Sequence, residues 1–163
     1  MVLDKVRGSS AAKEKNRVGL FVDGPNILRK QFEVDLDELR KKVSEYGRIT
    51  NAKVFLNQFA SEKLIEAVAS QGFEPIISLG GEQEEEGRSD IDVSMAVNAV
   101  EALEHGLDVM VLVTRDADFL PVIQKAKKEG VRVIVMGMDP GFSTALKNAA
   151  DEVMNLEKFK KEK

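Results

Sequence analysis

Cysteine is absent from this sequence of 163 residues, and histidine occurs once. Without cysteine the chain has no disulfide framework, no zinc–thiolate site and no thiol nucleophile. Because His105 is the single histidine, metal sites built from several histidines are also excluded. No plausible Ser-His or Cys-His nucleophile pair is left, so acyl-transfer chemistry of that kind is not expected.

Long hydrophobic runs and an excess of positive charge are missing as well. No apolar run approaches the roughly 18 residues needed to span a bilayer, and the N-terminus has no apolar segment of signal-peptide length. We therefore expect a cytoplasmic protein with no membrane contact. The formal net charge is −4, so nucleic acid binding would depend on local basic patches or on metal ions.

The apolar residues that are present, 43% of the chain, form an alternating series of strands and helices. Short, nearly all-apolar segments predict buried strands at residues 18–22, 49–55, 73–79, 109–113 and 131–136. Apolar residues at steps of three and four predict helices over 35–46, 61–71, 89–105, 119–129 and 143–150, with a short helix over 27–32 and an edge strand at 153–156. This order predicts a three-layer α/β/α fold with a mainly parallel sheet.

The sequence predicts a single domain over residues 16–157, because its length suits one core and no internal repeat is present. Residues 1–15 are polar and are interpreted as a flexible tail, and residues 158–163 as a Lys-rich tail. Residues 80–87, GGEQEEEG, are interpreted as a solvated acidic loop, with a lid over a site as the alternative.

Acidic residues recur where predicted strands end. Asp23 follows the first strand, Asp116 and Asp118 follow the fourth, and Asp90 and Asp92 open the long helix after the third. The carboxyl ends of parallel strands share one edge of the sheet, where α/β proteins bind ligands. Carboxylates that are distant in sequence are therefore expected to meet there.

Several carboxylates packed closely need a counter-charge, and a hard divalent cation such as Mg²⁺ supplies it. The chemistry implied is metal-assisted phosphoester hydrolysis. Helix capping is the plain alternative for Asp90, Asp116 and Asp118 taken singly. The specific signal is Asp23, Asp92 and Asp116 together.

Other polar residues at the same edge are weaker candidates. Asn26 either holds Asp23 or a phosphate, or caps the short helix. Arg115 is a candidate phosphate contact, with a surface arginine as the default reading. Ser143 is first a helix N-cap and only second a phosphate ligand.

Three segments together resemble a known family. They are FVDGPN after the first strand, RSDIDVSMAVNAV in the long helix and TRDADFLPVI after the fourth strand. In order and spacing they resemble the NYN domain, the PIN-like nuclease group that includes LabA-like proteins. The similarity runs from about residue 17 to residue 156.

The resemblance implies a PIN-like (Rossmann-like) sheet with strand order 3-2-1-4-5 and an acidic site for Mg²⁺ or Mn²⁺. It also implies ribonuclease activity, with RNA as the partner; self-association is left open. Asp23, Asp92, Asp116 and Asp118 match the metal-site acids, Asn26 the amide partner of the first acid, and Ser143 the small polar residue after the fifth strand.

The sequence departs from the family pattern at two positions. Asn98 stands where a carboxylate is common, which puts a second metal in doubt, and Arg115 adds a bulky cation beside the last acids. Two other functions are weighed. A non-catalytic RNA- or nucleotide-binding regulator is favoured modestly by the pI near 5.2 and by Asn98. A phosphatase of the haloacid-dehalogenase type is placed well behind, because Pro25 stands where it needs a second acid.

Overall fold

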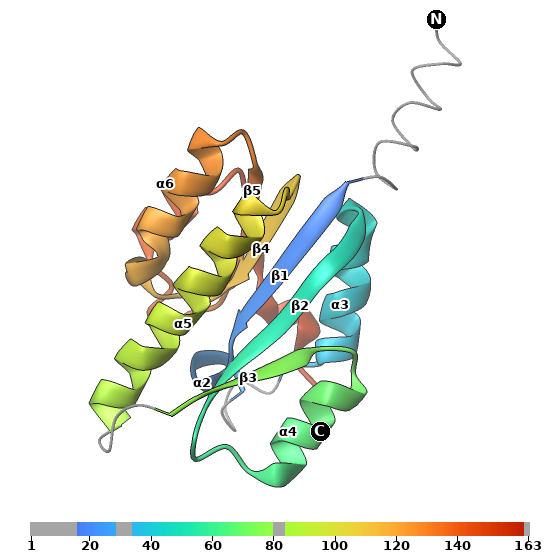
Figure 1. Ribbon diagram of the computed structural model, residues 1–163, viewed down its shortest axis with the longest axis vertical. Coiled ribbons are helices and arrows are strands. Elements are labelled where there is room, and N and C mark those ends of the chain that lie inside the picture. The colour runs from blue at the N-terminus through green and yellow to red at the C-terminus, as the bar shows by residue number, and fades with distance from the viewer. Residues whose placement is uncertain (1–15, 29–33, 80–83, 162–163) are drawn as a thin grey trace, which may run out of the picture.

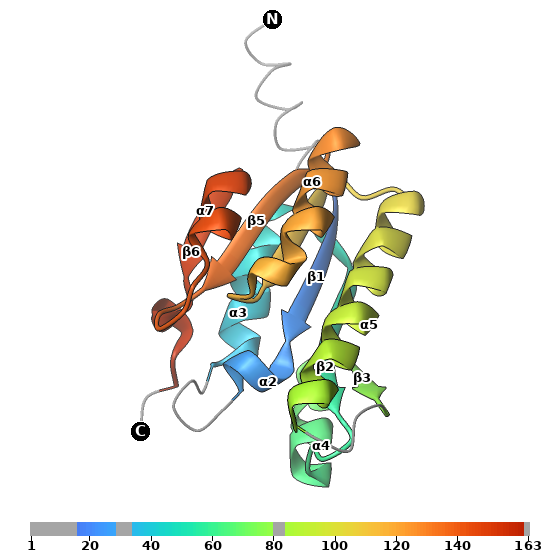
Figure 2. The same ribbon diagram turned by 90° about the vertical axis from the view of Figure 1, so that its left-hand side faces the viewer.

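The computed structural model describes residues 16–28, 34–79 and 84–161, without the side chains of residues 26, 27 and 84–90. It forms one six-stranded sheet in the order β3-β2-β1-β4-β5-β6 (Figures 1 and 2). Every neighbouring pair in this sheet is parallel. The strands are β1 (Arg17–Asp23), β2 (Arg48–Asn57), β3 (Glu74–Ser78), β4 (Val109–Val113), β5 (Arg132–Gly137) and β6 (Glu152–Asn155). The predicted fold class and the order of the first five strands are confirmed.

Helices cover both faces of the sheet. On one face lie α3 (Leu36–Val43), α4 (Glu62–Ser70) and the 3₁₀ turn η4 (Leu156–Phe159). On the other lie α5 (Glu84–Glu104), α6 (Leu120–Lys128) and α7 (Thr144–Ala149). Short elements complete the chain: α2 (Gly24–Ile27), η2 (Ser44–Tyr46) and η3 (Ala117–Phe119). Among the described residues, no helix is both long and apolar enough to cross a membrane.

The two faces of β1 and β4 explain why their sequences are continuously apolar. In β1, Val18, Leu20 and Val22 pack into the core under α3 and α4, whereas Phe21 packs into the core under α5 and α6. In β4, Met110 and Leu112 likewise face α5 and α6. Because side chains alternate along a strand, residues 23 and 114 continue the rows that face α5 and α6.

Local sequence signals set the helix ends. The Ser61 hydroxyl accepts a hydrogen bond from Leu64 N at 3.1 Å and caps α4. Asp35 caps α3 in the same way, accepting from the backbone of residues 37 and 38. Gly72 and Gly130, which follow α4 and α6, have φ of +89° and +78°, a conformation that glycine adopts without strain. Most predicted boundaries therefore lie within two or three residues of the observed ones.

The acidic segment was predicted wrongly. Residues 80–83 lie outside the described residues, but α5 already begins at Glu84, so residues 84–87 are helical and not loop. Glutamate is a good helix former, and acids near a helix N-terminus favour the helix dipole. Asp90 consequently lies inside the helix, and Asp92 lies about two turns from its start.

The short helix after β1 also differs from the prediction. It was expected over residues 27–32 but begins at Gly24, with Pro25 in its first turn, and spans four residues. Proline fits there because its missing N–H needs no partner in the first turn and its φ is already helical. Residues 29–33 of the predicted helix lie outside the described part of the chain.

Candidate metal centre

Asp23 is the last residue of β1 and one of the most deeply buried polar groups, with an exposed fraction of 1%. It continues the row of β1 that faces α5. The turn that follows it is packed tightly against β2, since a Cβ added to Gly24 would lie 2.4 Å from the Phe55 carbonyl oxygen. Only glycine permits this approach, so the glycine holds the end of β1 against its neighbour.

Thr114 is the first residue after β4 and is fully buried. Its hydroxyl donates a hydrogen bond to Asp23 Oδ2 at 3.1 Å and accepts one from the Asp116 backbone N–H at 3.2 Å. One hydroxyl therefore joins the end of β1 to the turn after β4. Thr114 was not among the residues predicted from the sequence. Its position two residues after Leu112 and four after Met110 indicates that it faces the same side of the sheet as those two side chains.

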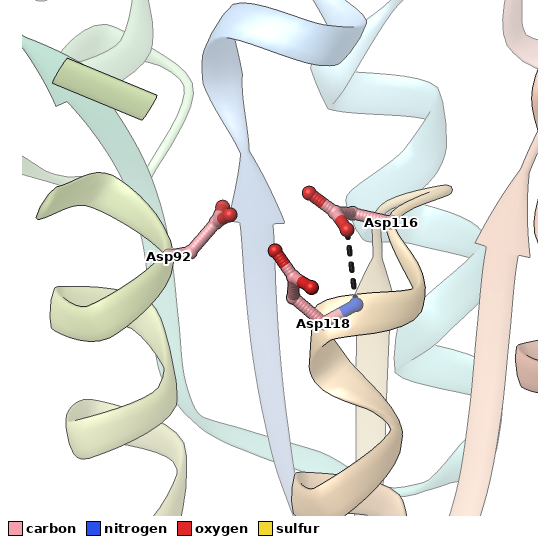
Figure 3. Close-up of side chains that lie close together, drawn as sticks. All are labelled: Asp92, Asp116 and Asp118. Carbon is pink, nitrogen blue, oxygen red and sulfur yellow. Dashed lines mark hydrogen bonds between the residues drawn. The ribbon is translucent and has the colours of Figure 1, made fainter. Parts of the chain in front are cut away.

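Asp116 and Asp118 are brought together by η3. Asp116 Oδ1 accepts a hydrogen bond from the Asp118 backbone N–H at 2.9 Å, which is the capping role weighed for Asp116 (Figure 3). Asp118 itself is exposed. Capping uses one oxygen of Asp116, and a carboxylate has further lone pairs for a ligand. The structural role and a metal-binding role are therefore compatible.

Asp92 reaches the same place from α5. That helix is anchored on the sheet by the buried side chains of Ile91, Met95 and Ala99, so the neighbouring Asp92 is half-buried at its margin. One carboxylate oxygen from each of Asp92, Asp116 and Asp118 lies within 4.8 Å of the others. Figure 3 shows Asp92 pointing from the helix toward the two acids of the β4 turn.

The electrostatics of this cluster are unfavourable for a full set of bare charges. Burial, together with the neighbouring carboxylates of Asp23, Asp116 and Asp118, raises the pKa of Asp92 to about 8, and burial is the largest of these causes. Asp23 is thus electrostatically part of the site, although it is not among the three acids whose oxygens meet. Neighbouring carboxylates that disfavour one another's ionised form are suited to binding a cation.

The three predicted phosphate-contact residues are Arg115, Ser143 and Asn26, and they lie outside the acidic cluster itself. The Arg115 side chain donates a hydrogen bond from Nη1 to the Pro140 carbonyl oxygen. The backbone carbonyl oxygen of Arg115 accepts a hydrogen bond from Ser143 N at 3.0 Å. The Ser143 hydroxyl caps α7 by accepting from Leu146 N at 3.3 Å. Asn26 lies in α2, but its side chain is outside the described part of the structure. The phosphate contacts expected of these three residues stay predictions.

A polar contact between β2 and α5 was also missed. Lys53 of β2 donates from Nζ to Asn98 Oδ1 at 3.0 Å, and Asn98 Nδ2 donates to the Ser94 carbonyl at 2.8 Å. Lys53 is within a strand whose apolar pattern gave no reason to examine it. Only the packing of α5 over β2 brings the lysine to Asn98.

The acids gathered at the carboxyl edge of the parallel sheet offer oxygen ligands of the type that a divalent cation takes, and comparison with known proteins identifies the family of the chain. The NYN domain family model matches residues 17–157, so the chain belongs to the NYN domain family, which is nuclease-like. The resemblance inferred from three sequence segments is thereby confirmed.

Individual proteins also show the similarity. "Uncharacterized protein MJ0482" of Methanocaldococcus jannaschii is 53% identical over 145 residues, which cover 88% of this chain and 57% of that protein. The chain thus spans little more than half the length of this relative. A crystal structure of VPA0982, a protein of unknown function from Vibrio parahaemolyticus RIMD 2210633, matches with a TM-score of 0.76 at 20% identity, over 88% of this chain and 94% of that one. This likeness supports the fold.

Proposed function

We propose that this protein is a ribonuclease that depends on Mg²⁺ or Mn²⁺ and hydrolyses phosphodiester bonds of RNA. The observation that carries the proposal is the convergence of Asp92, Asp116 and Asp118, with oxygens within 4.8 Å, beside the buried Asp23. Membership of a nuclease-like family supports the same reaction class.

The donor set fits a hard divalent cation. All four side chains offer carboxylate oxygens, the ligands that Mg²⁺ and Mn²⁺ prefer, and none offers a soft sulfur donor. The pKa of Asp92 is raised by burial and by the neighbouring acids, and a bound cation would offset both effects. Asp92, Asp116 and Asp118 would hold the ion, with Asp23 alongside.

A bound divalent ion supplies charge stabilisation for the phosphoryl group and an acidified water as the nucleophile. The residues of the chain prepare the place for this chemistry. Thr114 fixes the Asp23 carboxylate and the Asp116 backbone relative to one another. Asn26, Arg115 and Ser143 are the proposed contacts to substrate phosphates at the same edge.

The charge of the chain bears on how RNA is held. With a net charge of −4, the protein as a whole repels a polyanion. RNA affinity should therefore depend on the divalent ion itself, and chelation should abolish binding and cleavage together.

The direct test is cleavage of end-labelled single-stranded RNA with Mn²⁺, Mg²⁺ or EDTA. D92N and D116N should lower kcat by at least a hundredfold, the scale of losing a preorganised electrostatic contact. Asparagine is chosen because its carbonyl oxygen keeps the hydrogen bond from Asp118 N to position 116. E101Q is the matched control, since Glu101 is an exposed acid on the same helix as Asp92.

The outcomes separate the two functions weighed at the outset. Cleavage that is equal in wild type, D92N and D116N would contradict the proposal. RNA binding that persists in EDTA without any cleavage would instead identify a non-catalytic RNA-binding regulator, the alternative that the acidic pI and Asn98 favour.

A further inference from the structure

Phe59 differs from the other aromatic residues of the chain. Five of the eight phenylalanines, Phe21, Phe55, Phe73, Phe119 and Phe142, are buried in the two cores. Among the described residues, Phe59 is the one aromatic side chain that is largely exposed, at 65%. Single exposed apolar side chains are common on protein surfaces, but an aromatic ring in water presents a flat face on which a planar ligand can stack.

The ring is held in place by a hydrogen-bonded turn. Asn57 is the last residue of β2. Its side-chain Oδ1 accepts a hydrogen bond from Phe59 N at 2.9 Å, and its backbone carbonyl oxygen accepts one from Ala60 N at 3.1 Å. Ser61 then caps α4. The backbone on both sides of Phe59 is thus fixed, and the exposure of the ring is a property of the turn.

This turn lies at the edge of the sheet that carries the acidic cluster. Asp23 is paired in register with Phe55, so β2 ends beside the site, one strand away from Asp23. The close approach of Gly24 to the Phe55 carbonyl fixes the ends of the two strands against each other. In both ribbon views the connection from β2 to α4 lies at the same end of the molecule as α2 and the first turns of α5 (Figures 1 and 2).

We propose that Phe59 stacks on a base of single-stranded RNA next to the nucleotide at the metal centre. The inference rests on the proposed ribonuclease function. A base in a single strand leaves a face free for an aromatic ring, whereas a base in a duplex is already stacked on its neighbours. Stacking does not depend on positive charge, which suits a chain with a net charge of −4. Phe59 thereby selects unpaired over paired RNA.

The kinetic test compares F59A and F59W on a single-stranded RNA and on a duplex of the same sequence. F59A should raise KM for the single strand roughly tenfold, the scale of losing one stacked base, and leave kcat within about twofold. F59W should restore KM, because a larger aromatic ring stacks at least as well. Cleavage of the duplex should be equally poor in all three proteins.

A binding test is independent of turnover. The sequence contains no tryptophan, so the indole of F59W is the single tryptophan reporter in the protein. With all four acids intact and Mn²⁺ present, single-stranded RNA should quench this fluorescence by stacking in the first milliseconds after mixing, before cleavage, and the duplex should not. H105W is the matched control, because His105 is exposed beyond the C-terminal end of α5, at the opposite edge of the sheet, and its fluorescence should not respond.

The possible results are distinguishable. If wild type cleaves RNA and F59A has an unchanged KM, or if F59W is not quenched, the stacking role is wrong while the ribonuclease function stands. If wild type does not cleave but F59W is quenched, the ribonuclease function fails and the base contact remains. If F59A alters the oligomeric state in sedimentation and leaves RNA binding intact, Phe59 belongs to a protein interface and the inference is overturned.

Discussion

The Thr114 hydroxyl lies 3.1 Å from Oδ2 of Asp23, and both residues are buried. The two residues are 91 positions apart in the chain, yet this hydrogen bond fixes the end of β1 against the turn after β4. The same hydroxyl accepts from Asp116 N. Thr114 is therefore the direct link between two of the acids at the candidate metal centre.

Replacing Thr114 tests this link. T114V keeps the shape of the side chain but removes the hydroxyl, so Asp23 loses this donor and Asp116 N loses this acceptor. We expect T114V to lower the free energy of unfolding by about 1–3 kcal/mol and to weaken Mn²⁺ binding. T114S should stay close to wild type in denaturant titrations and calorimetry. A loss in T114S with none in T114V would show that packing of the methyl group, and not the hydroxyl, matters.

The raised pKa of Asp92 predicts how the metal-free protein responds to pH. From the ordinary value of 3.8 up to about 8, folded Asp92 keeps a proton that the unfolded chain has released. Stability from this group therefore falls as the pH rises through that window and changes no further above it. D92N should flatten the fall and be more stable than wild type at pH 8 in EDTA, as measured by denaturant unfolding. E101Q should follow the wild-type curve.

Metal binding should release a proton below pH 8. An ion that binds the Asp92 carboxylate needs the ionised form, and the metal-free site favours the protonated form. Titration calorimetry of Mn²⁺ at pH 7, in buffers that differ in ionisation enthalpy, should show release approaching one proton. In D92N the release should vanish, and its persistence there would assign the proton to another group.

The contact between Lys53 and Asn98 bears on the number of metal ions. The Lys53 ammonium lies 3.0 Å from Asn98 Oδ1, so a carboxylate at position 98 would meet this cation first. We expect N98D to bind as many Mn²⁺ ions as wild type and to gain no more than about 1 kcal/mol of stability from the new ion pair. The double variant K53M/N98D removes the lysine that would pair with the new carboxylate, and so tests whether Lys53 keeps a further ion from binding there. An additional Mn²⁺ in N98D alone would contradict the prediction.

Gly24 tests whether the tight turn after Asp23 is needed for the site. In G24A the new Cβ would lie 2.4 Å from a backbone oxygen and 2.7 Å from the Leu56 side chain. We expect a loss of about 3 kcal/mol in unfolding free energy, with weaker Mn²⁺ binding, because the end of β1 must move. G130A is the control: its Cβ meets nothing within 4 Å, but its φ of +78° costs about 1 kcal/mol. Metal affinity in G130A should equal that of wild type.

Much of the fold could be predicted because the signals are local. The apolar runs at residues 109–113 and 131–136 and the glycines that follow α4 and α6 each act within a few residues. The prediction for residues 80–87 was wrong because their charge and flanking glycines are also typical of a loop. Helix propensity and the continuation of α5 determined its structure from Glu84 onward.

The candidate site was only partly accessible from the sequence. Each acid was found because it follows a strand or sits on the long helix, and the edge rule for parallel sheets predicted that they gather. The sequence did not distinguish Asp23, which accepts a hydrogen bond from Thr114, from Asp92, Asp116 and Asp118, whose oxygens lie within 4.8 Å of one another. It also gave no sign that Lys53 reaches Asn98.

The sequence by itself determined the class of fold, the family and the set of acids, because strand period, helix period and motif spacing are properties of the chain order. The tertiary structure decided which acids lie within 4.8 Å of one another, which hydroxyl joins Asp23 to Asp116, and which aromatic ring stays in water. The physical reason is that burial, proximity and pKa depend on neighbours supplied by distant segments, and only the packed sheet and helices bring those segments together.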